Sequence, residues 1–529
     1  MNSWYMTRRT ALGLIAAAAA TPRLAWSNKQ TLAPNRPKYH LTPYTAWIND
    51  PQRPMFIDGV WNLWVLWNAD YPNGNGTAWR RFTSTDLIQW ADQGVSIPKY
   101  TTLYGDVWTG STVVDTNNTA GFGAGTVIAL MTMPCDNLGG QSTGRWYSLD
   151  DGISFTFDSI VQVNPQIAAG VAPASMVFRD PCIFWYAPGN YWVMSLAEIG
   201  KLSIYTSIDL KNWVYASGYL RSDLGIMECP HLFQMHLYEP DGVTTLEDKW
   251  VLLCGANGYE YGLTTGTHYW TGSFDGITFT PDSYYGQWLD GGADFYATTV
   301  FADANALDPM AYMLALAWNN NWDYATKIPT VGYFGQISIT RQLRLQISDG
   351  LPILYNSPVT GIDSIFKAAV TGTKQVISDS TNYAFPTWQA GPACWIEFTM
   401  SPVHGSWPGG IYFSLRGGDG YFTQLGFGPA YSNAFLKRDT GGSQPTSDAA
   451  WTANENVTLD FSEPVTVSVF SDVGSVEVFL NGGRISISSL TTAPLDATFL
   501  NLSASGGSVE ISKMKIRNVA GHCETSGCG

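Results

Sequence analysis

Three acidic residues of the chain stand directly before a proline or a Cys-Pro step. Asp50 lies in the string Trp-Ile-Asn-Asp-Pro, Asp180 in Arg-Asp-Pro and Glu228 in Glu-Cys-Pro. Proline restricts the backbone of its neighbours, so it fixes the direction in which such a carboxylate points. Each motif alone is also compatible with a simple turn, and joint chemistry requires that the three acids meet.

Two carboxyl groups that meet in a pocket can cleave a glycosidic bond. One attacks or stabilises the anomeric carbon, while the other protonates the departing oxygen. Hydrogen-bond donors keep the attacking group ionised, whereas an apolar setting beside a negative neighbour keeps the acid protonated. Glu228 lies between Met227 and Cys229, and Asp50 follows Asn49. These neighbours favour Glu228 as acid/base and Asp50 as nucleophile.

The elements that would position these acids are short β-strands. Apolar runs between Gly, Asn and Asp turns have almost no helical periodicity, which predicts an all-β fold. A Ser-x-Asp motif followed by an aromatic residue recurs at a period of about 60 residues, which fits one four-stranded propeller blade. We expect each Asp to shape a turn and each aromatic to pack between blades, with unrelated hairpin turns of a β-sandwich as the alternative. The repeats begin at Ser84, Ser148, Ser207 and Ser273.

A propeller would bring the acids together, because its innermost strands converge on one axis. After Arg344 the composition changes, and alternating strands such as 465–470 and 475–479 favour a separate β-sandwich. The expected organisation is an export signal over 1–27, a propeller over 38–345, a linker over 346–370, a sandwich over 371–520 and a tail over 521–529.

Composition restricts the class of partner. The 529 residues carry a formal charge of −15, with 13% charged and 14% aromatic residues. Such an acidic chain repels phosphate backbones and anionic membranes, so neither nucleic acid nor a membrane is an expected partner. Many Trp and Tyr side chains with few charges suit stacking against neutral rings. An oligo- or polysaccharide is the expected substrate.

The N-terminus predicts export. Arg8 and Arg9 precede an apolar run over 11–20, which is too short to span a bilayer. This pattern is typical of a twin-arginine signal, with an ordinary secretory signal as the alternative. We therefore expect a secreted or periplasmic protein.

Neither a metal nor a cofactor is expected. The six histidines form no close array with carboxylates, and no glycine-rich phosphate loop precedes a helix. Five cysteines lie singly in apolar runs and are expected to be buried thiols, whereas Cys523 and Cys528 could close a small loop.

The three acidic strings, in this order, closely resemble the signature motifs of glycoside hydrolase family 32, which contains invertases, inulinases and levanases. The resemblance runs from about His40 to Val519. It implies a five-bladed β-propeller followed by a C-terminal β-sandwich, and retaining cleavage of β-fructofuranosides through a covalent fructosyl-enzyme. Further matching strings are Thr109-Gly-Ser111, Asp294-Phe-Tyr-Ala297, Trp318-Asn-Asn-Asn-Trp322 and Val476-Glu-Val-Phe479.

The resemblance also implies roles for single residues. Asp50 matches the nucleophile, Glu228 the acid/base, and Asp180 a transition-state stabiliser that grips fructose hydroxyls. Trp79 and Trp318 could instead pack between blades. The remaining matches are expected to bind substrate: Arg179, the pocket-wall residues Asn49, Trp79 and Ser111, and the aromatic Trp318.

Two departures from the family pattern bear on the substrate. Asn-Asp-Pro continues here with Gln52-Arg53-Pro54 in place of Asn-Gly, and Leu66 stands where many members carry Gln. Both indicate a changed pocket edge, which favours a fructan such as levan or inulin over sucrose. The Gln-Arg-Pro string is similar to the bacterial levan-processing branch of the family.

Two other functions remain open. The same residues would serve a levan fructotransferase, which passes the fructosyl group to a sugar hydroxyl and releases a difructose dianhydride. A non-catalytic propeller that binds sugar through its aromatics is the second alternative, although pure binding needs no acidic trio.

Overall fold

The computed structural model describes residues 36–168, 177–258, 265–330, 332–386, 390–418, 421–440 and 444–520. The expected export signal, the C-terminal tail, Cys523 and Cys528 lie outside these residues. Within the described ranges, no helix is long and apolar enough to cross a membrane.

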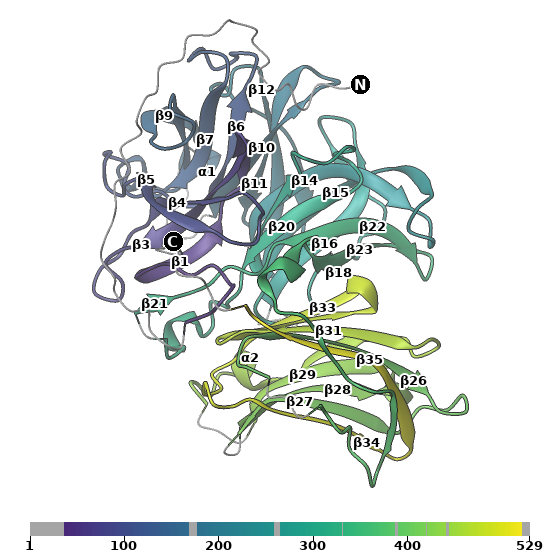
Figure 1. Ribbon diagram of the computed structural model, residues 1–529. Helices are drawn as coiled ribbons and strands as arrows, with labels where there is room; N and C mark the ends of the chain where they lie inside the picture. Colours follow the sequence, from purple (N-terminus) through teal and green to yellow (C-terminus); the bar gives the residue numbers. More distant parts are fainter. Residues whose placement is uncertain are drawn as a thin grey trace, which may run out of the picture.

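Most of the described strands before residue 359 form five blades in which successive strands are antiparallel (Figure 1). Their first strands contact one another in the order β6, β10, β14, β19 and β1, so they surround the axis. Named from that axis outward, the blades are β1 (Ala46–Pro51), β3 (Val60–Asn68), β4 (Ala78–Ser84) and β5 (Ala91–Ile97); β6 (Gly110–Asp115), β7 (Thr126–Met133), β8 (Ser142–Ser148) and β9 (Thr156–Val163); β10 (Phe178–Tyr186), β11 (Tyr191–Glu198), β12 (Lys201–Ser207) and β13 (Val214–Leu220); β14 (Ile226–Tyr238), β15 (Thr245–Asn257), β16 (Thr265–Phe274) and β17 (Phe279–Pro281); and β19 (Tyr296–Ala302), β20 (Met313–Trp318), β22 (Arg341–Ser348) and β23 (Leu351–Pro358).

The repeated Ser-x-Asp motif forms the turn between the third and fourth strands of a blade. In the first three repeats the serine hydroxyl donates a hydrogen bond to the aspartate, and each aspartate also accepts backbone N–H groups of its turn. The aromatic that follows in the second blade, Phe155, packs edge-on against Trp64 and Trp79 of the first blade. The repeat therefore shapes a turn and fills a seam between blades, as predicted.

Four of the innermost strands are interrupted by a β-bulge where the signature strings lie. A bulge places an extra residue on one strand and re-aims its side chains. Asp180, Cys229 and Ala297 have positive φ angles of 62°, 49° and 49° at these interruptions. The shifts of register fall between Asn49 and Pro51, Arg179 and Cys182, Glu228 and His231, and Tyr296 and Thr299.

The C-terminal strands form two packed sheets, drawn in green to yellow in Figure 1. Their inner faces share one apolar core that includes Ile396, Phe413 and Val467. The prediction of an all-β propeller followed by a β-sandwich is confirmed. The first sheet contains β24 (Val370–Thr371), β25 (Gln375–Ser378), β26 (Cys394–Pro402), β31 (Val465–Ser471), β32 (Ser475–Leu480), β33 (Ile485–Leu490) and β35 (Ser508–Asn518), and the second contains β27 (Gly410–Gly418), β28 (Tyr421–Gly428), β29 (Asn433–Thr440), β30 (Glu455–Thr458) and β34 (Phe499–Ser505).

The segment expected to be a linker, 346–370, is largely ordered by the propeller. Strand β23 pairs with β22 along its whole length, from Arg341 opposite Pro358 to Ser348 opposite Leu351. The expected boundary at residue 345 is therefore wrong, because the last blade needs this hairpin to complete its four strands.

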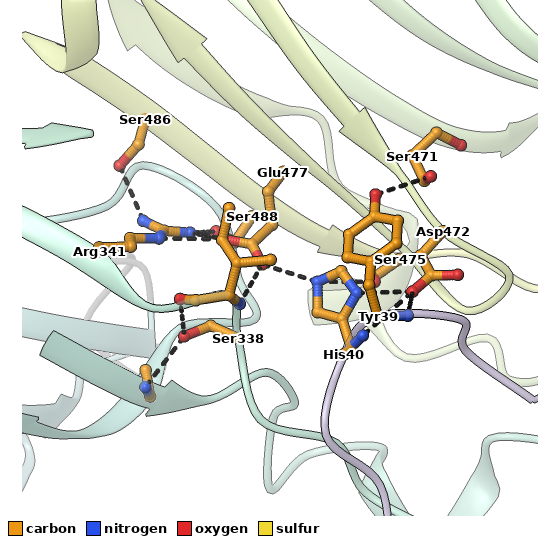
Figure 2. Close-up of polar contacts among 12 residues, drawn as sticks. Tyr39, His40, Ser338, Arg341, Ser471, Asp472, Ser475, Glu477, Ser486 and Ser488 are labelled. Carbon is orange, nitrogen blue, oxygen red and sulfur yellow. Dashed lines mark hydrogen bonds and ion pairs between the residues drawn. The ribbon is translucent and has the colours of Figure 1, made fainter. Parts of the chain in front are cut away.

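A buried charge network joins the two domains (Figure 2). The imidazole of His40 lies between two sandwich carboxylates, 2.9 Å from Asp472 and 2.8 Å from Glu477. On the other side of Glu477, the Arg341 Nε donates to its Oε2 at 3.0 Å, and Arg341 Nη1 donates to Asp290 at 2.8 Å. All these side chains are fully buried.

Candidate active site

The three acids of the signature strings meet on the propeller axis. They come from three different blades, on β1, β10 and β14. The backbone N–H of Cys229 donates to Asp180 Oδ2 at 2.9 Å, which ties the second motif to the third. Burial is the main cause of the raised pKa of Asp50 and Asp180, and the negative charge of Glu228 raises both further, so all three carboxylates are electrostatic neighbours.

Asp50 is oriented by donors on both carboxylate oxygens. The Asn49 amide donates to Oδ1 at 2.9 Å, and the Thr109 hydroxyl donates to Oδ2. Burial raises the pKa of Asp50, and the donated hydrogen bonds oppose this shift by favouring the ionised form. Such a carboxylate is fixed in direction and available for attack.

Asp180 is buried, whereas Asp50 and Glu228 are partly exposed. Its backbone N–H donates to the Thr132 hydroxyl at 2.7 Å, which holds the bulge at this residue. Burial, with the charge of Glu228 as the second cause, raises the pKa of Asp180 to about 8, although Arg179 opposes the shift. A carboxyl group in this state can donate a hydrogen bond as well as accept one.

Glu228 has more polar surroundings than its chain neighbours indicated. Arg179 Nη1 donates to its Oε1 at 2.8 Å, and the Tyr296 hydroxyl donates to its Oε2 at 2.7 Å. Met227 and Cys229 are instead buried in two different apolar clusters. Because successive residues of a strand point to opposite faces, apolar neighbours in sequence do not make an apolar site. The expectation of an apolar setting for Glu228 is corrected.

The predicted substrate-binding residues divide into two groups. Asn49 and Arg179 touch the acids directly. Ser111, Trp79 and Trp318 are fully buried. The Ser111 hydroxyl donates to the Pro181 carbonyl at 2.9 Å and accepts the N–H of Ile183 at 3.0 Å, so it braces the second acidic string.

The two tryptophans are packing residues. Trp79 lies in the core between the first two blades, where its indole N–H donates to the Trp108 carbonyl at 2.9 Å. Trp318 packs under Trp47 and Trp322, with ring centroids 5.8 and 4.6 Å apart. Both indoles are fully buried, which agrees with the alternative that they pack within the propeller.

Three residues at the site had no role assigned from the sequence. Thr109 and Tyr296 lie in strings that resemble the family, yet neither was given a part in the site. Trp322 is 42% exposed and stacks on Trp47, whose indole N–H donates to Asn49 at 2.9 Å. An exposed indole beside Asn49, the neighbour of Asp50, offers an apolar face on which a ring can stack.

The side chains of Gln52 and Arg53, in the Gln-Arg-Pro string, support the backbone around the site. Gln52 is fully buried; its amide donates to the Asp50 carbonyl and accepts the Gly110 N–H, both at 2.7 Å. Arg53 donates to the Ile183 carbonyl at 2.7 Å. The departure therefore braces three blades against one another, and the expectation that Gln52 changes the pocket edge is corrected.

Two family models match the chain. The N-terminal domain of glycosyl hydrolases family 32 matches residues 40–358, and the C-terminal domain of that family matches residues 366–518. The chain belongs to glycosyl hydrolase family 32. The family 32 assignment makes it a glycoside hydrolase and accounts for the order of the acidic strings along the blades.

Similar proteins of known name come from bacteria and fungi. A levanbiose-producing levanase of Bacillus subtilis is 35% identical over 91% of this chain and 90% of its own length. A levanbiose-producing levanase of Geobacillus stearothermophilus is 42% identical over 64% of this chain and 85% of its own length. The crystal structure of exo-inulinase from Aspergillus awamori superposes with a TM-score of 0.80 at 27% identity, covering 92% of this chain and 99% of the inulinase.

Proposed function

We propose that this family 32 protein is a retaining β-fructofuranosidase that cleaves fructans, with levan as its preferred substrate. The observation that carries the proposal is the convergence of Asp50, Asp180 and Glu228 on one axis, with donors aimed at Asp50 and Glu228. The similarity to levanases along most of the chain supports a fructan as substrate and levanbiose as a product.

In the proposed mechanism Asp50 attacks the anomeric carbon of a fructosyl unit. Glu228 gives its proton to the departing glycosidic oxygen as that bond breaks, which leaves a fructosyl ester on Asp50. Glu228 then takes a proton from water, the water oxygen attacks the same carbon, and Asp50 is released. Asp180 hydrogen-bonds fructose hydroxyls throughout, and Arg179 holds Glu228 in line with the departing oxygen.

We also propose that the protein works outside the cytoplasm. Relatives of this chain include fungal exo-inulinases named as extracellular. Together with the pattern of Arg8, Arg9 and the apolar run after them, this supports secretion or release to the periplasm. Cultures that express the full chain should accumulate activity outside the cytoplasm, and an Arg8→Lys, Arg9→Lys variant should retain it inside.

Asp50→Asn is the direct test of the mechanism. Turnover of levan should fall by about 10⁴-fold or more, because the attacking group is lost, while levan binding remains. Product analysis of the unmodified enzyme should show levanbiose and no difructose dianhydride. Unchanged turnover in the variant would remove Asp50 from the mechanism, and dianhydride as the main product would replace hydrolysis by intramolecular transfer.

A further inference from the structure

The segment that leads into the fifth blade is held by the sandwich. The N–H of Gly291 donates to the Ser486 carbonyl at 2.8 Å, and the N–H of Asp294 donates to the Ser488 carbonyl at 3.2 Å. In return, the N–H of Leu490 donates to Asp294 Oδ2 at 2.8 Å. Residues 291–294 therefore run beside β33 and take their position from the second domain.

The side chain of Arg438, in the sandwich, adds an ion pair to this contact. Arg438, on β29, donates to Asp294 Oδ2 and to Glu455 Oε1, both at 2.8 Å, and to the Tyr324 hydroxyl at 3.1 Å. Tyr324 in turn donates to Asp294 Oδ1 at 2.6 Å. Arg438 and Asp294 are both buried, so this ion pair is little screened by solvent.

Two residues after Asp294, the chain contacts Glu228. Tyr296 is the first residue of β19, and its hydroxyl donates to Glu228 Oε2 at 2.7 Å. Tyr296 is almost fully buried, and close-packed interiors transmit small displacements. A shift of Asp294 would therefore carry the Tyr296 hydroxyl with it.

We propose that Arg438 is a positioning residue for catalysis: through Asp294 and Tyr296, the sandwich holds the Glu228 carboxyl against the departing oxygen. This inference rests on the proposed role of Glu228 as acid/base. Glu228 also faces Arg179, Asp50 and Asp180, which lie on the propeller strands β10 and β1. The second domain thus takes part in proton delivery without touching the substrate.

The test compares two substrates in Arg438→Met, Tyr296→Phe and the double variant. β-Fructofuranosyl fluoride releases an ion that needs no proton from an acid, whereas levan does need one. Each single variant should lose about tenfold in kcat/KM on levan and less than about twofold in kcat/KM on the fluoride. This constant ends at bond cleavage, so it excludes the later step in which Glu228 takes a proton from water. The double variant should be no slower than Tyr296→Phe, because both changes act through one hydroxyl.

Equal losses on both substrates, or losses that multiply in the double variant, would overturn the inference. Arg484→Met is the matched control, since Arg484 also joins the domains, to Ser348 and Asp349 on the far hairpin. It should leave the ratio of the two rates unchanged. If Arg438→Met does not fold, Arg438→Lys and Tyr324→Phe should change that ratio in the same direction, and no change would equally overturn the inference.

Glu228→Gln separates this inference from the proposed function. It should lose about 10²-fold or more in kcat/KM on levan, while kcat/KM on the fluoride, which ends at bond cleavage, is spared. An equal loss of kcat/KM on both substrates in Glu228→Gln would refute the acid role itself. A spared fluoride rate in Glu228→Gln with an unchanged ratio in Arg438→Met would refute only the positioning role.

Discussion

Two clusters of buried carboxylates in this protein are built in opposite ways. In the cluster between the domains, each carboxylate contacts a guanidinium or an imidazole, and Figure 2 shows these contacts for Asp472 and Glu477. In the cluster on the propeller axis, two of the three carboxylates accept side-chain or backbone hydrogen bonds only from neutral donors, and the third accepts one from an arginine and one from a tyrosine. The interface cluster is Asp290, Asp472, Glu477, His40 and Arg341, and the axial cluster is Asp50, Asp180, Glu228 and Arg179.

The difference is visible in the direction of the pKa shifts. Burial opposes ionisation of Glu477, but Arg341 and His40 outweigh it and lower the pKa of Glu477 to about 2. Burial and a like charge raise the pKa of Asp180 to about 8. The buried carboxylates with cationic partners join the domains. A buried carboxylate beside like charges destabilises the fold, and its raised pKa indicates a functional site.

Removing a cation from the interface cluster should have the largest effect on stability. Arg341→Met leaves Glu477 and Asp290 buried without their guanidinium, and this should lower the free energy of unfolding by about 3–5 kcal/mol. Urea denaturation at neutral pH measures the loss. Arg484→Met, at the solvent-exposed pair with Asp349, should lose less than about 1 kcal/mol. Equal losses would mean that burial does not distinguish the two pairs.

His40→Gln should have a smaller effect that depends on pH. Burial lowers the pKa of His40, but the hydrogen bonds and charges of Asp472 and Glu477 outweigh it and raise the pKa to about 9. A raised pKa stabilises the fold fully below the unfolded pKa of about 6.5, and this gain is lost as pH rises through 9. Thermal denaturation should show the variant about 2 kcal/mol less stable near pH 6, with the gap closing above about pH 10. A gap that stays constant across that range would exclude a charged imidazole.

The strand pattern, the repeated turn and the acidic strings were sufficient to predict the fold and the acids that meet. They sufficed because each is local: alternation marks a strand, Ser-x-Asp marks a turn, and the propeller brings the first strands to one axis. The burial of Trp79, Trp318 and Ser111 could not be predicted, because a residue type does not reveal which side of a blade it faces.

Contacts that join distant segments had no local signal. Tyr296 and Glu228 are 68 residues apart, and Arg438 and Asp294 are 144 apart. The string Asp294-Phe-Tyr-Ala297 marked the place but not the partners. The apolar neighbours of Glu228 misled for a related reason, since a strand sends them to other faces.

The axial cluster should give the smallest change in stability, with the opposite sign. An Asp180→Asn side chain cannot ionise, so the variant escapes the cost of charging a buried group beside Glu228. Because the folded-state pKa of Asp180 is about 8 and the unfolded pKa is about 3.9, the unmodified protein loses stability as pH rises between these values. The variant should therefore be about 1–2 kcal/mol more stable near pH 8, equal near pH 4, and greatly impaired on levan.

Asp472→Asn is the matched opposite of that variant. Burial raises the pKa of Asp472, but the contact with His40 outweighs it and the net shift is downward, so its stabilising effect is present at neutral pH and disappears as the solution is acidified. Asp472→Asn should lose stability at neutral pH, where Asp180→Asn gains it, and levan turnover by the folded fraction should be unchanged. If both variants lost stability at neutral pH, the axial carboxylates would be as well matched as those between the domains. Their grouping would then reflect packing, and the raised pKa of Asp180 would no longer point to catalysis.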